Sequence, residues 1–550
     1  MSDPVRDLAS AVADASSSLR GGNPTFGRTG GAARLPVVER PPKPDFGDYS
    51  TNAALLLAPA LGEPPREVAE RLGSALSEQL EEQVERVEVA GPGFLNLFMS
   101  DSWVRAGVAG ALASGDAYGA GDPAAGERTN VEFVSANPTG PMHIGHARHA
   151  AYGDSLCRIL EFAGNEVERE YYVNDHGGQI QRFAASVRAR ARGEEPPEDG
   201  YRGDYVTGLA GRIDGAADID DDELGRRGVE IMIEEIKAAL ERFRVHMDHF
   251  AHEREKHESK AVEAALERLS ERGNVYSHEG AVWLRTTAFG DDKDRVLVRS
   301  GGEETYFAAD IAYHADKLER GYDRVIDVWG ADHHGYVGRM RAAWEALGGE
   351  PDRLELLIMQ LVNLMEGGAR AQMSKRAGAI VTLDDLIDDI GVDATRWFLV
   401  QRSHDTALDL DLELARRQSQ DNPVYYAQYA HARIASILRK AGEERVEAAL
   451  EADLAGGDAP LHPSERALVK GLLELPGEVR EAAARRAPHR MTTYVTETAQ
   501  AFSAFYRDCK VVGAAEEGGD EDLRIALCEA TRRVIARGLD LLGVQAPQAM

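Results

Sequence analysis

Two histidines three residues apart begin a predicted helix that directly follows an apolar run. Residues 131–134 form the run, a turn rich in proline and glycine comes next, and His143, Gly145 and His146 follow. Backbone N–H groups at a helix N-terminus attract phosphate, and both histidines can point outward there. A glycine between them lets a flat base lie against the backbone. Alone, the spacing suits a phosphate site or a pair of surface or metal-binding histidines, so both remain open.

A polar, glycine-flanked segment far downstream carries Met373-Ser374-Lys375-Arg376 and follows the apolar residues 354–364. A lysine on such a loop can close over a triphosphate as a point charge. By itself, a basic loop is usually only solvated. Because the two segments lie on either side of a strand and helix pattern, their combination predicts a site for a nucleoside triphosphate.

Helix and strand patterns divide the chain into three predicted domains. Residues 1–121 mix helical and strand periods, which indicates a small α+β domain. Residues 122–411 alternate strands and helices, and residues 412–550 have helical period almost throughout. We therefore expect a multidomain α/β protein with an all-helical C-terminal domain.

The central domain has the pattern of a parallel sheet. A strand, a helix and a second strand are predicted at residues 131–134, 145–163 and 167–173. Such a crossover implies parallel strands. Apolar strands return at 325–328 and 354–361, so the core is expected to be doubly wound. The charged stretch at about 182–285 is expected to be a helical insertion between the two halves of the sheet.

Composition limits the classes of protein that the chain can belong to. The net charge of -30 excludes a protein that coats nucleic acid by bulk electrostatics, so any nucleic-acid site must be a local patch. No apolar run approaches the roughly 20 residues that cross a bilayer, and the start lacks a cationic signal-peptide head. We expect a cytoplasmic protein without membrane contact.

The numbers of cysteines and lysines indicate what metal sites and what kind of surface the protein has. Cys157, Cys509 and Cys528 are too widely spaced for a metal cluster or a disulfide framework, so no protein-held metal site is expected. Lysine occurs only about ten times, and arginine supplies most of the 63 basic side chains. This acidic, arginine-rich composition resembles that of proteins from salt-loving cytoplasms, although an acidic surface also serves solubility alone.

The two segments resemble the signature motifs of class I aminoacyl-tRNA synthetases, His-Ile-Gly-His and a variant of Lys-Met-Ser-Lys-Ser. Longer stretches across most of the chain resemble the arginyl-tRNA synthetase family. They are residues 46–52, 91–96, 132–146, 171–175, 306–314, 330–335, 422–433 and 542–547. The chain departs from the family pattern at Gln372 and Arg376, which flank the lysine segment, and at His176.

This resemblance implies a Rossmann-type catalytic core and a two-step ligation. Arginine would react with ATP to give arginyl-adenylate and pyrophosphate, and the arginyl group would then pass to the 3′ end of tRNA(Arg), releasing AMP. The implied catalytic residues are His143, His146 and Lys375. The implied ATP-binding residues are Pro138, Gly140, His143, Gly145, His146, Met373, Ser374 and Lys375, with Mg²⁺ accompanying ATP. Members of the family generally need bound tRNA before they activate arginine.

The resemblance also implies where arginine binds. A guanidinium cation is bound best by carboxylates through parallel hydrogen bonds. The family points to Glu132, Tyr306 and Asp310 around the guanidinium, to Asn137 near the α-amino group, and to Asp332 and His333 at the edge of the pocket. Tyr306 and Asp310 are four residues apart, so on a helix they would share one face.

In the family, the N-terminal domain meets the elbow of tRNA and the helical C-terminal domain, the anticodon-binding domain, meets the anticodon. Asn52, Tyr425, Tyr426 and Tyr429 are the candidate contacts, because tyrosines can stack on unpaired bases. The tyrosines' spacing fits packing between helices equally well, and the alternative role for Asn52 is that of a helix cap. The expected partners are tRNA(Arg), arginine and ATP, bound by a monomer.

Two other readings remain open from the sequence. One is a related enzyme, either a class I synthetase for another amino acid or a nucleotidylyltransferase. The other is a non-catalytic tRNA-binding paralogue, although such proteins usually lose the motif residues that this chain keeps.

Overall fold

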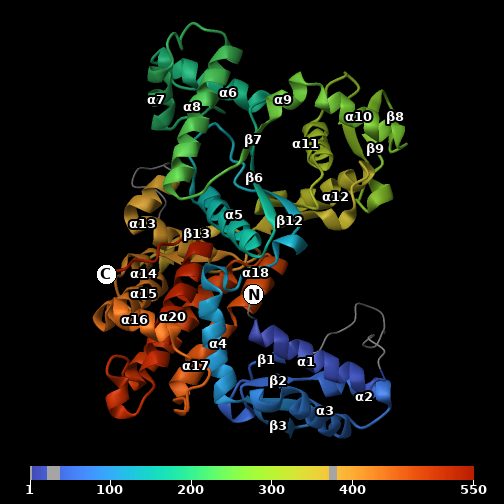
Figure 1. Ribbon diagram of the computed structural model, residues 1–550. Helices are drawn as coiled ribbons and strands as arrows, with labels where there is room; N and C mark the ends of the chain where they lie inside the picture. Colours follow the sequence, from blue (N-terminus) through green and yellow to red (C-terminus); the bar gives the residue numbers. More distant parts are fainter. Residues whose placement is uncertain (1–2, 22–36, 371–380) are drawn as a thin grey trace.

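The computed structural model describes residues 3–21, 37–370 and 381–550. In Figure 1 the N-terminal unit (blue) and the C-terminal helices (orange to red) share one end of the molecule, and the central unit occupies the other. Within the described ranges, no helix combines the length and the apolar character that a membrane span requires.

The N-terminal unit is an antiparallel sheet of order β1-β2-β4-β3 with helices packed on it. Its elements are α1 (Pro4–Leu19), β1 (Val38–Glu39), β2 (Tyr49–Thr51), α2 (Ala53–Leu61), α3 (Pro65–Leu80), β3 (Val84–Ala90) and β4 (Phe94–Met99). Helix α3 begins with proline at its first position, and its buried Val68, Leu72 and Leu76 recur at helical spacing. Helix α4 (Asp101–Ala113) then leads to the central unit.

The central unit is built on a five-stranded parallel sheet of order β12-β11-β5-β6-β7. The strands are β5 (Arg128–Glu132), β6 (Glu166–Val173), β7 (His249–His252), β11 (Arg324–Gly330) and β12 (Leu354–Met359). The chain runs outward from β5 in one direction and from β11 in the other, so the predicted doubly wound core is confirmed. Ligands of such sheets bind outside the carboxyl ends of the strands, at the point where the order reverses.

The segments between the strands of this sheet are mostly helical. They are α5 (Ile144–Phe162), α6 (Gly178–Ala191), α7 (Asp204–Arg212), α8 (Asp221–Arg242), α9 (Glu253–Glu258), α10 (Ala261–Glu271), α11 (Tyr306–Arg320) and α12 (Val337–Ala346). A small antiparallel sheet of order β10-β9-β8 precedes α11. Its strands are β8 (Val275–His278), β9 (Ala281–Leu284) and β10 (Arg295–Val298).

The stretch at about 182–285, expected to be a helical insertion, contains strands as well as helices. Helices α6, α7 and α8 form a lobe of their own (Figure 1), but β7 then returns to the main sheet and pairs in parallel with β6. Strands β8 and β9 also fall within the range. The sequence of β7, His-Phe-Ala-His, is short and half polar, so it gives no apolar strand signal.

A second small sheet joins the core to the C-terminal helices. Its order is β14-β13-β15, from β13 (Val362–Glu366), β14 (Ala369–Arg370) and β15 (Leu408–Asp411). Helix α13 (Leu383–Val400) lies between β14 and β15 in the chain. The remaining helices are α14 (Leu412–Arg416), α15 (Pro423–Ala441), α16 (Glu443–Glu451), α17 (Pro463–Leu473), α18 (Leu475–Ala484), α19 (His489–Asp508) and α20 (Glu521–Leu541).

Helix α5, which starts at the histidine pair, lies unusually close to the segment after β5. Gly153 in α5 faces Phe133, and an added Cβ at Gly153 would lie 2.2 Å from Phe133 Cγ. Real Cβ atoms essentially never approach this closely. Gly153 is therefore needed for the close packing that sets α5, and with it the histidines, against the sheet.

Helix α11 is held to the sheet by a buried ammonium group. Lys317 Nζ lies 2.7 Å from Glu132 Oε2 on β5 and 2.8 Å from Asp327 Oδ1 on β11. All three side chains are buried, and Lys317 is inaccessible to solvent. Since a buried charge without a partner costs several kcal/mol, this cluster fixes α11 across the point where the sheet reverses.

We predict that Gly153→Ala lowers the free energy of unfolding by about 1–3 kcal/mol, because the new methyl group overpacks against Phe133. Urea denaturation measures the loss. Gly208→Ala in α7 is the matched control, since an added Cβ there meets no atom within 4 Å. The control should gain up to about 1 kcal/mol from helix propensity. Equal effects of the two variants would contradict the prediction.

We predict that Lys317→Met destabilises the protein by about 3–5 kcal/mol, because it leaves Glu132 and Asp327 without their shared cation. The exposed pair of Lys237 and Glu234 supplies the control, and Lys237→Met should cost less than about 1 kcal/mol. The measurement is again urea denaturation. A loss for Lys317→Met no larger than for Lys237→Met would show that the buried cluster does not hold α11.

Candidate active site

The turn between β5 and α5 has a strained backbone and is held by several hydrogen bonds. Val134 and Ser135 have φ angles of 72° and 38°, which side chains other than glycine rarely adopt. Ser135 Oγ donates to Glu132 Oε1 at 2.9 Å and accepts the N–H of Tyr172 at 3.0 Å. The hydroxyl of Tyr171 donates to the carbonyl of Ala136 at 2.7 Å. These bonds hold a conformation that the local sequence disfavours.

The two histidines stand together at the start of α5. Their rings stack with centroids 3.7 Å apart and planes inclined by 21°. Nδ1 of His143 accepts the N–H of Gly145 at 3.0 Å, and Nδ1 of His146 accepts the N–H of His143 at 3.4 Å. An added Cβ at Gly145 would lie 2.8 Å from Cε1 of His143, so the stacked arrangement needs this glycine.

Both histidines are neutral hydrogen-bond donors. Burial lowers the pKa of His143, and burial together with repulsion from the protonated form of the His143 ring lowers the pKa of His146 to about 3. Since each Nδ1 accepts a backbone N–H, the remaining proton of each neutral ring is on Nε2. The pair therefore offers N–H groups to an anion without carrying charge.

The segment with Met373, Ser374 and Lys375 lies outside the described residues. The residues that follow it are described, and they are bonded to the histidine turn. The carbonyl of Val381 accepts the N–H of Ile144 at 3.3 Å, and the N–H of Leu383 donates to the carbonyl of Met142 at 2.8 Å. Residues 381–383 and 142–144, far apart in the sequence, are thus neighbours.

Among the described residues, neither of two carboxyl groups near the carboxyl ends of the strands forms an ion pair with a lysine or an arginine, and His257 Nε2 lies 3.9 Å from Glu253 Oε1. Asp310, on α11, accepts the hydroxyl of Tyr336 at 2.5 Å, and burial raises its pKa. Glu253 begins α9 directly after β7 and is buried, and its Oε2 has no hydrogen-bond partner. Burial raises the pKa of Glu253 to about 8, and the nearby charges of Asp310 and Asp175 add to the rise. The pair would be stabilised by a bound cation.

The other buried acids of this region already have partners. Glu132 is bonded through one oxygen to Lys317 and through the other to Ser135. Asp175 accepts from His252 Nδ1 at 2.8 Å and from the N–H of Arg254 at 2.9 Å. Glu253 and Asp310 are therefore the carboxyl groups left to meet a cationic ligand.

The remaining residues predicted for arginine lie on α11, on the turn before α5 and on the short helix after β11. Tyr306 and Asp310 both lie on α11, as their spacing predicted, and the side chain of Tyr306 is 67% exposed. Asn137 is exposed on the turn before α5. Asp332 and His333 are exposed on the short helix that follows β11, with His333 Nε2 3.5 Å from Asp332 Oδ2. The ring of Trp329 lies 5.9 Å from that of His333.

The candidate tRNA residues lie elsewhere, on other units. Asn52 precedes α2 without a capping side-chain bond and instead accepts the N–H of Val37 at 3.3 Å. Tyr425, Tyr426 and Tyr429 are partly buried on α15. The rings of Tyr425 and Tyr429 stack at 6.3 Å. A small cavity of about 130 Å³ between α15 and α19 is lined by Gln420, Tyr426, Tyr429, Ala430, Arg433, Phe502, Ser503 and Tyr506.

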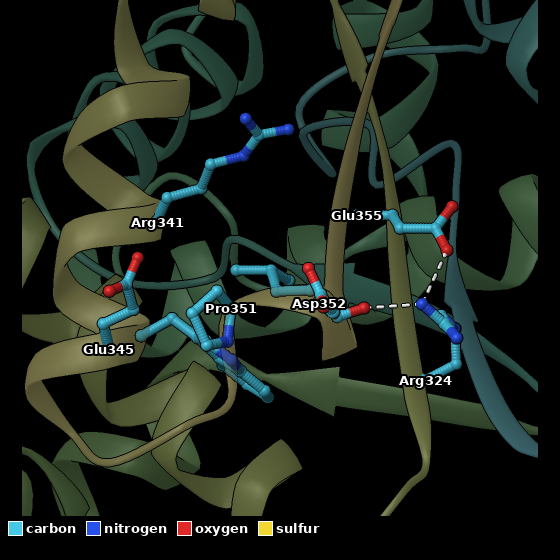
Figure 2. A pocket seen from close by; sticks show the side chains of 8 residues that line it. Arg324, Arg341, Glu345, Pro351, Asp352 and Glu355 are labelled. Atoms are coloured by element: carbon cyan, nitrogen blue, oxygen red, sulfur yellow. Dashed lines mark hydrogen bonds and ion pairs between the residues drawn. The ribbon is translucent and has the colours of Figure 1, made fainter. Parts of the chain in front are cut away.

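A larger hollow lies at the wrong end of the sheet for catalysis. It has a volume of about 680 Å³ and includes Arg324 and Leu354, which begin β11 and β12. Figure 2 shows Arg324 bonded within it, to the Asp352 carbonyl and the Glu355 carboxylate. Arg341 points away from these groups in the same view. The chemistry-bearing side chains described above lie at the opposite, carboxyl ends of the strands.

Sequence reasoning missed Glu253 and Tyr336. Both follow core strands at their carboxyl ends, Glu253 after β7 and Tyr336 at the end of the short helix after β11. Position after a strand is the signal that identifies such residues. This signal could not be used for Glu253, because the sequence of β7 does not have the apolar pattern that predicts a strand.

Three family models match consecutive parts of the chain. "Arginyl tRNA synthetase N terminal domain" matches residues 6–99, and "tRNA synthetases class I (R), catalytic domain" matches residues 108–196 and 217–435. "DALR anticodon binding domain" matches residues 427–550. The catalytic model alone covers more than half of the chain.

Solved structures agree with these matches. A putative arginyl-tRNA synthetase from Campylobacter jejuni is 35% identical, with 82% of this chain and 100% of that chain covered and a TM-score of 0.76. Arginyl-tRNA synthetase from Thermus thermophilus is 25% identical, with 99% of this chain and 100% of that chain covered and a TM-score of 0.78. Methionyl-tRNA synthetase from Mycobacterium tuberculosis, at 14% identity, 76% and 91% coverage and a TM-score of 0.55, shares the fold alone. The chain belongs to the class I arginyl-tRNA synthetases, the ligases that join arginine to tRNA for protein synthesis.

Proposed function

We propose that Glu253 and Asp310 together bind the guanidinium group of the arginine substrate. The observation that carries this assignment is the buried Glu253 Oε2, which has no partner, beside a second carboxyl group whose pKa is also raised. Two like charges in a dry site repel each other, and a planar cation between them removes the repulsion. A guanidinium can donate paired hydrogen bonds to carboxylates, which an ammonium cannot match.

The neighbouring residues have supporting roles in this proposal. Asn137, exposed on the turn, receives the α-amino group, and Tyr306, Asp332 and His333 form the rim of the pocket. The contacts of Glu132 favour a positioning role over direct contact with arginine, because both of its oxygens are occupied by Lys317 and Ser135. Through Ser135, Glu132 steadies the strained turn beside the substrate.

ATP is assigned to the start of α5. The Nε2–H groups of His143 and His146 donate to phosphate oxygens, and Gly145, Pro138 and Gly140 leave room for the nucleoside against the backbone. Met373, Ser374 and Lys375 complete the ATP site from the segment before Val381. The bond between Val381 and Ile144 supports this assignment, because it fixes the end of that segment beside the histidines.

The reaction needs no nucleophile from the protein. The arginine carboxylate attacks the α-phosphorus, the bond to pyrophosphate breaks, and the adenylate then yields its arginyl group to the terminal ribose of tRNA with release of AMP. His143, His146 and Lys375 stabilise the charge that develops on phosphate oxygens. Mg²⁺ would accompany ATP and is usually held largely by phosphates and water, and we assign no described residue to it.

The tRNA is assigned to the outer units. We divide the chain into domains 1–121, 122–411 and 412–550, of which the first meets the tRNA elbow through Asn52. Tyr425, Tyr426 and Tyr429 meet the anticodon. The small cavity beside Tyr426 and Tyr429 supports base stacking there, each stacked base contributing about 1–3 kcal/mol. We assign a monomer, because one chain carries every residue named for the reaction, and we place it in the cytoplasm, where tRNA is charged for protein synthesis.

We predict that Glu253→Gln raises the KM for arginine at least about 100-fold while the KM for ATP changes little, because an unpaired guanidinium charge costs about 3 kcal/mol or more. In the wild type, Glu253 is protonated below its raised pKa of about 8. Arginine binding must then release a proton, so apparent affinity should rise with pH toward about 8 and level off above it.

The control for this prediction is Glu255→Gln, which makes the same change at an exposed position of the same helix. It should leave the KM for arginine and its pH dependence unchanged. Pyrophosphate exchange with tRNA present gives the KM values, and calorimetry in buffers of different ionisation enthalpy gives the released proton. Arginine affinity that is flat between pH 6 and 8 in the wild type would contradict the assignment.

We predict that Lys375→Ala nearly abolishes adenylate formation, because it removes the lysine that neutralises the leaving pyrophosphate. Turnover in pyrophosphate exchange, with tRNA and arginine present, measures this step. Lys293→Ala, a change at an exposed lysine, is the control and should behave as wild type. Retention of more than about a tenth of wild-type turnover by Lys375→Ala would refute the role, since removal of one such contact typically costs about 100-fold or more.

A further inference from the structure

The helical lobe of α6, α7 and α8 contacts the turn that precedes α5. The lobe has a hydrophobic core of its own, which includes Phe183, Val206 and Leu224. The catalytic family model stops at residue 196 and resumes at residue 217. Helix α7 and the residues just before it therefore belong to a part of the chain that the family pattern does not describe.

Thr139, in the middle of the turn, receives two hydrogen bonds from this lobe. The hydroxyl of Tyr205, in α7, donates to the carbonyl of Thr139 at 2.7 Å. Gln179 Nε2, in α6, lies 3.5 Å from Thr139 Oγ1, and the N–H of Thr139 donates to the carbonyl of Asn137 at 2.8 Å. Thr139 is only 4% exposed, so these polar groups cannot turn to bulk water instead.

Two glycines make room for the tyrosine. An added Cβ at Gly140 would lie 3.2 Å from the hydroxyl oxygen of Tyr205. An added Cβ at Gly203 would lie 2.6 Å from the Tyr205 ring. The phenol is thus closely enclosed between the turn and its own helix. Burial raises the pKa of Tyr205 to about 12, so the hydroxyl keeps its proton and remains a donor at neutral pH.

We propose that Tyr205 is a positioning residue that sets the ATP-binding turn through the carbonyl of Thr139. The inference rests on the proposed function, in which Pro138 and Gly140 on either side of Thr139 bind ATP. The turn follows two residues with unfavourable φ angles and closes on a bond between Asn137 and Thr139 only two residues apart. Such a short closure holds the backbone weakly. The bond from Tyr205 supplies a fixed external anchor.

The test is Tyr205→Phe in the full-length enzyme, assayed with ATP, arginine and tRNA. This change removes the hydroxyl and keeps the ring. The KM for ATP should rise about three- to tenfold, the usual worth of one neutral hydrogen bond, while the KM for arginine stays within about twofold. Tyr201→Phe is the matched control, because Tyr201 lies in the same unmatched segment and its ring packs edge-on against Phe183 at 5.6 Å. It should leave both KM values unchanged.

Two results would overturn the inference. One is an unchanged KM for ATP in Tyr205→Phe, and the other is an equal rise in both KM values together with a lowered unfolding midpoint, which indicates a structural role only. His143→Ala in the same assay separates this inference from the proposed function. If His143→Ala raises the KM for ATP and Tyr205→Phe does not, only the role of Tyr205 fails. If neither does, the assignment of ATP to this turn fails as well.

Discussion

The ammonium group of Lys317 lies between the carboxylates of Glu132 and Asp327, without access to solvent. These acids end β5 and lie within β11, the two strands on either side of the point where the sheet reverses. His314, three residues earlier on α11, adds a second cation. Its Nδ1 faces the carbonyl of Asp310 at 2.8 Å and its Nε2 faces Asp327 at 2.9 Å, so both nitrogens must donate. Hydrogen bonding to Asp327 raises the pKa of His314 in agreement with a charged ring.

This cluster determines where the proposed arginine pocket lies. Asp310 lies two turns before Lys317 on the same helix, so fixing Lys317 to the sheet also fixes Asp310 at the strand ends. Glu132 and Asp327 share the cation of Lys317, whereas Glu253 and Asp310 form no ion pair with a lysine or an arginine of the described residues. The proposed cation site thus lies where, in the described part of the chain, two acids have no lysine or arginine of their own.

Buried cations recur at the junctions between units. Arg105, Arg148 and Arg396 are almost fully buried although the chain carries a net charge of -30. Arg105 joins α4 to the start of α20, and Arg148 joins α5 to carbonyls beside β12 and β15. Arg396 joins α13 to the carbonyl of Leu542, at the end of α20. Because arginine donates up to five hydrogen bonds in a fixed plane, it can satisfy several carbonyls at once. The negative charge is thereby concentrated at the surface, and units distant in sequence share one core.

Much of the core could be predicted because its signals are local. The helix at residues 145–163, the strand at 167–173 and the shared helix of Tyr306 and Asp310 all follow from periodicity, and they match α5, β6 and α11. The strand expected at 131–134 ends at Glu132, because Val134 takes a left-handed conformation fixed by tertiary hydrogen bonds. Likewise, the strand expected at 354–361 ends at Met359, and the chain then enters β13, which belongs to a different sheet. Such features depend on partners distant in sequence.

The site residues also fall into two groups, those that the local sequence reveals and those that depend on contacts distant in sequence. The histidine pair carries its chemistry in neighbouring residues, so the sequence could single it out once the lysine segment and the family resemblance were added to its spacing. Glu253 differs, because its significance comes from burial beside Asp310 and from the lack of a partner for Oε2. Neither property is visible in the sequence around it. The roles of Glu132 and Lys317 likewise depend on a contact between residues 185 positions apart.

The neutrality of the histidines fits the charge of the amino acid that reacts beside them. Arginine brings two cations, its guanidinium and its α-ammonium, into the same site as ATP. Charged imidazoles would bind the phosphates of ATP more strongly, but they would also repel the cationic arginine. Burial, which lowers the pKa of His146 to about 3, keeps the N–H donors and removes the charge. In the proposed function, positive charge can then be left to Lys375, which acts where negative charge develops in the transition state.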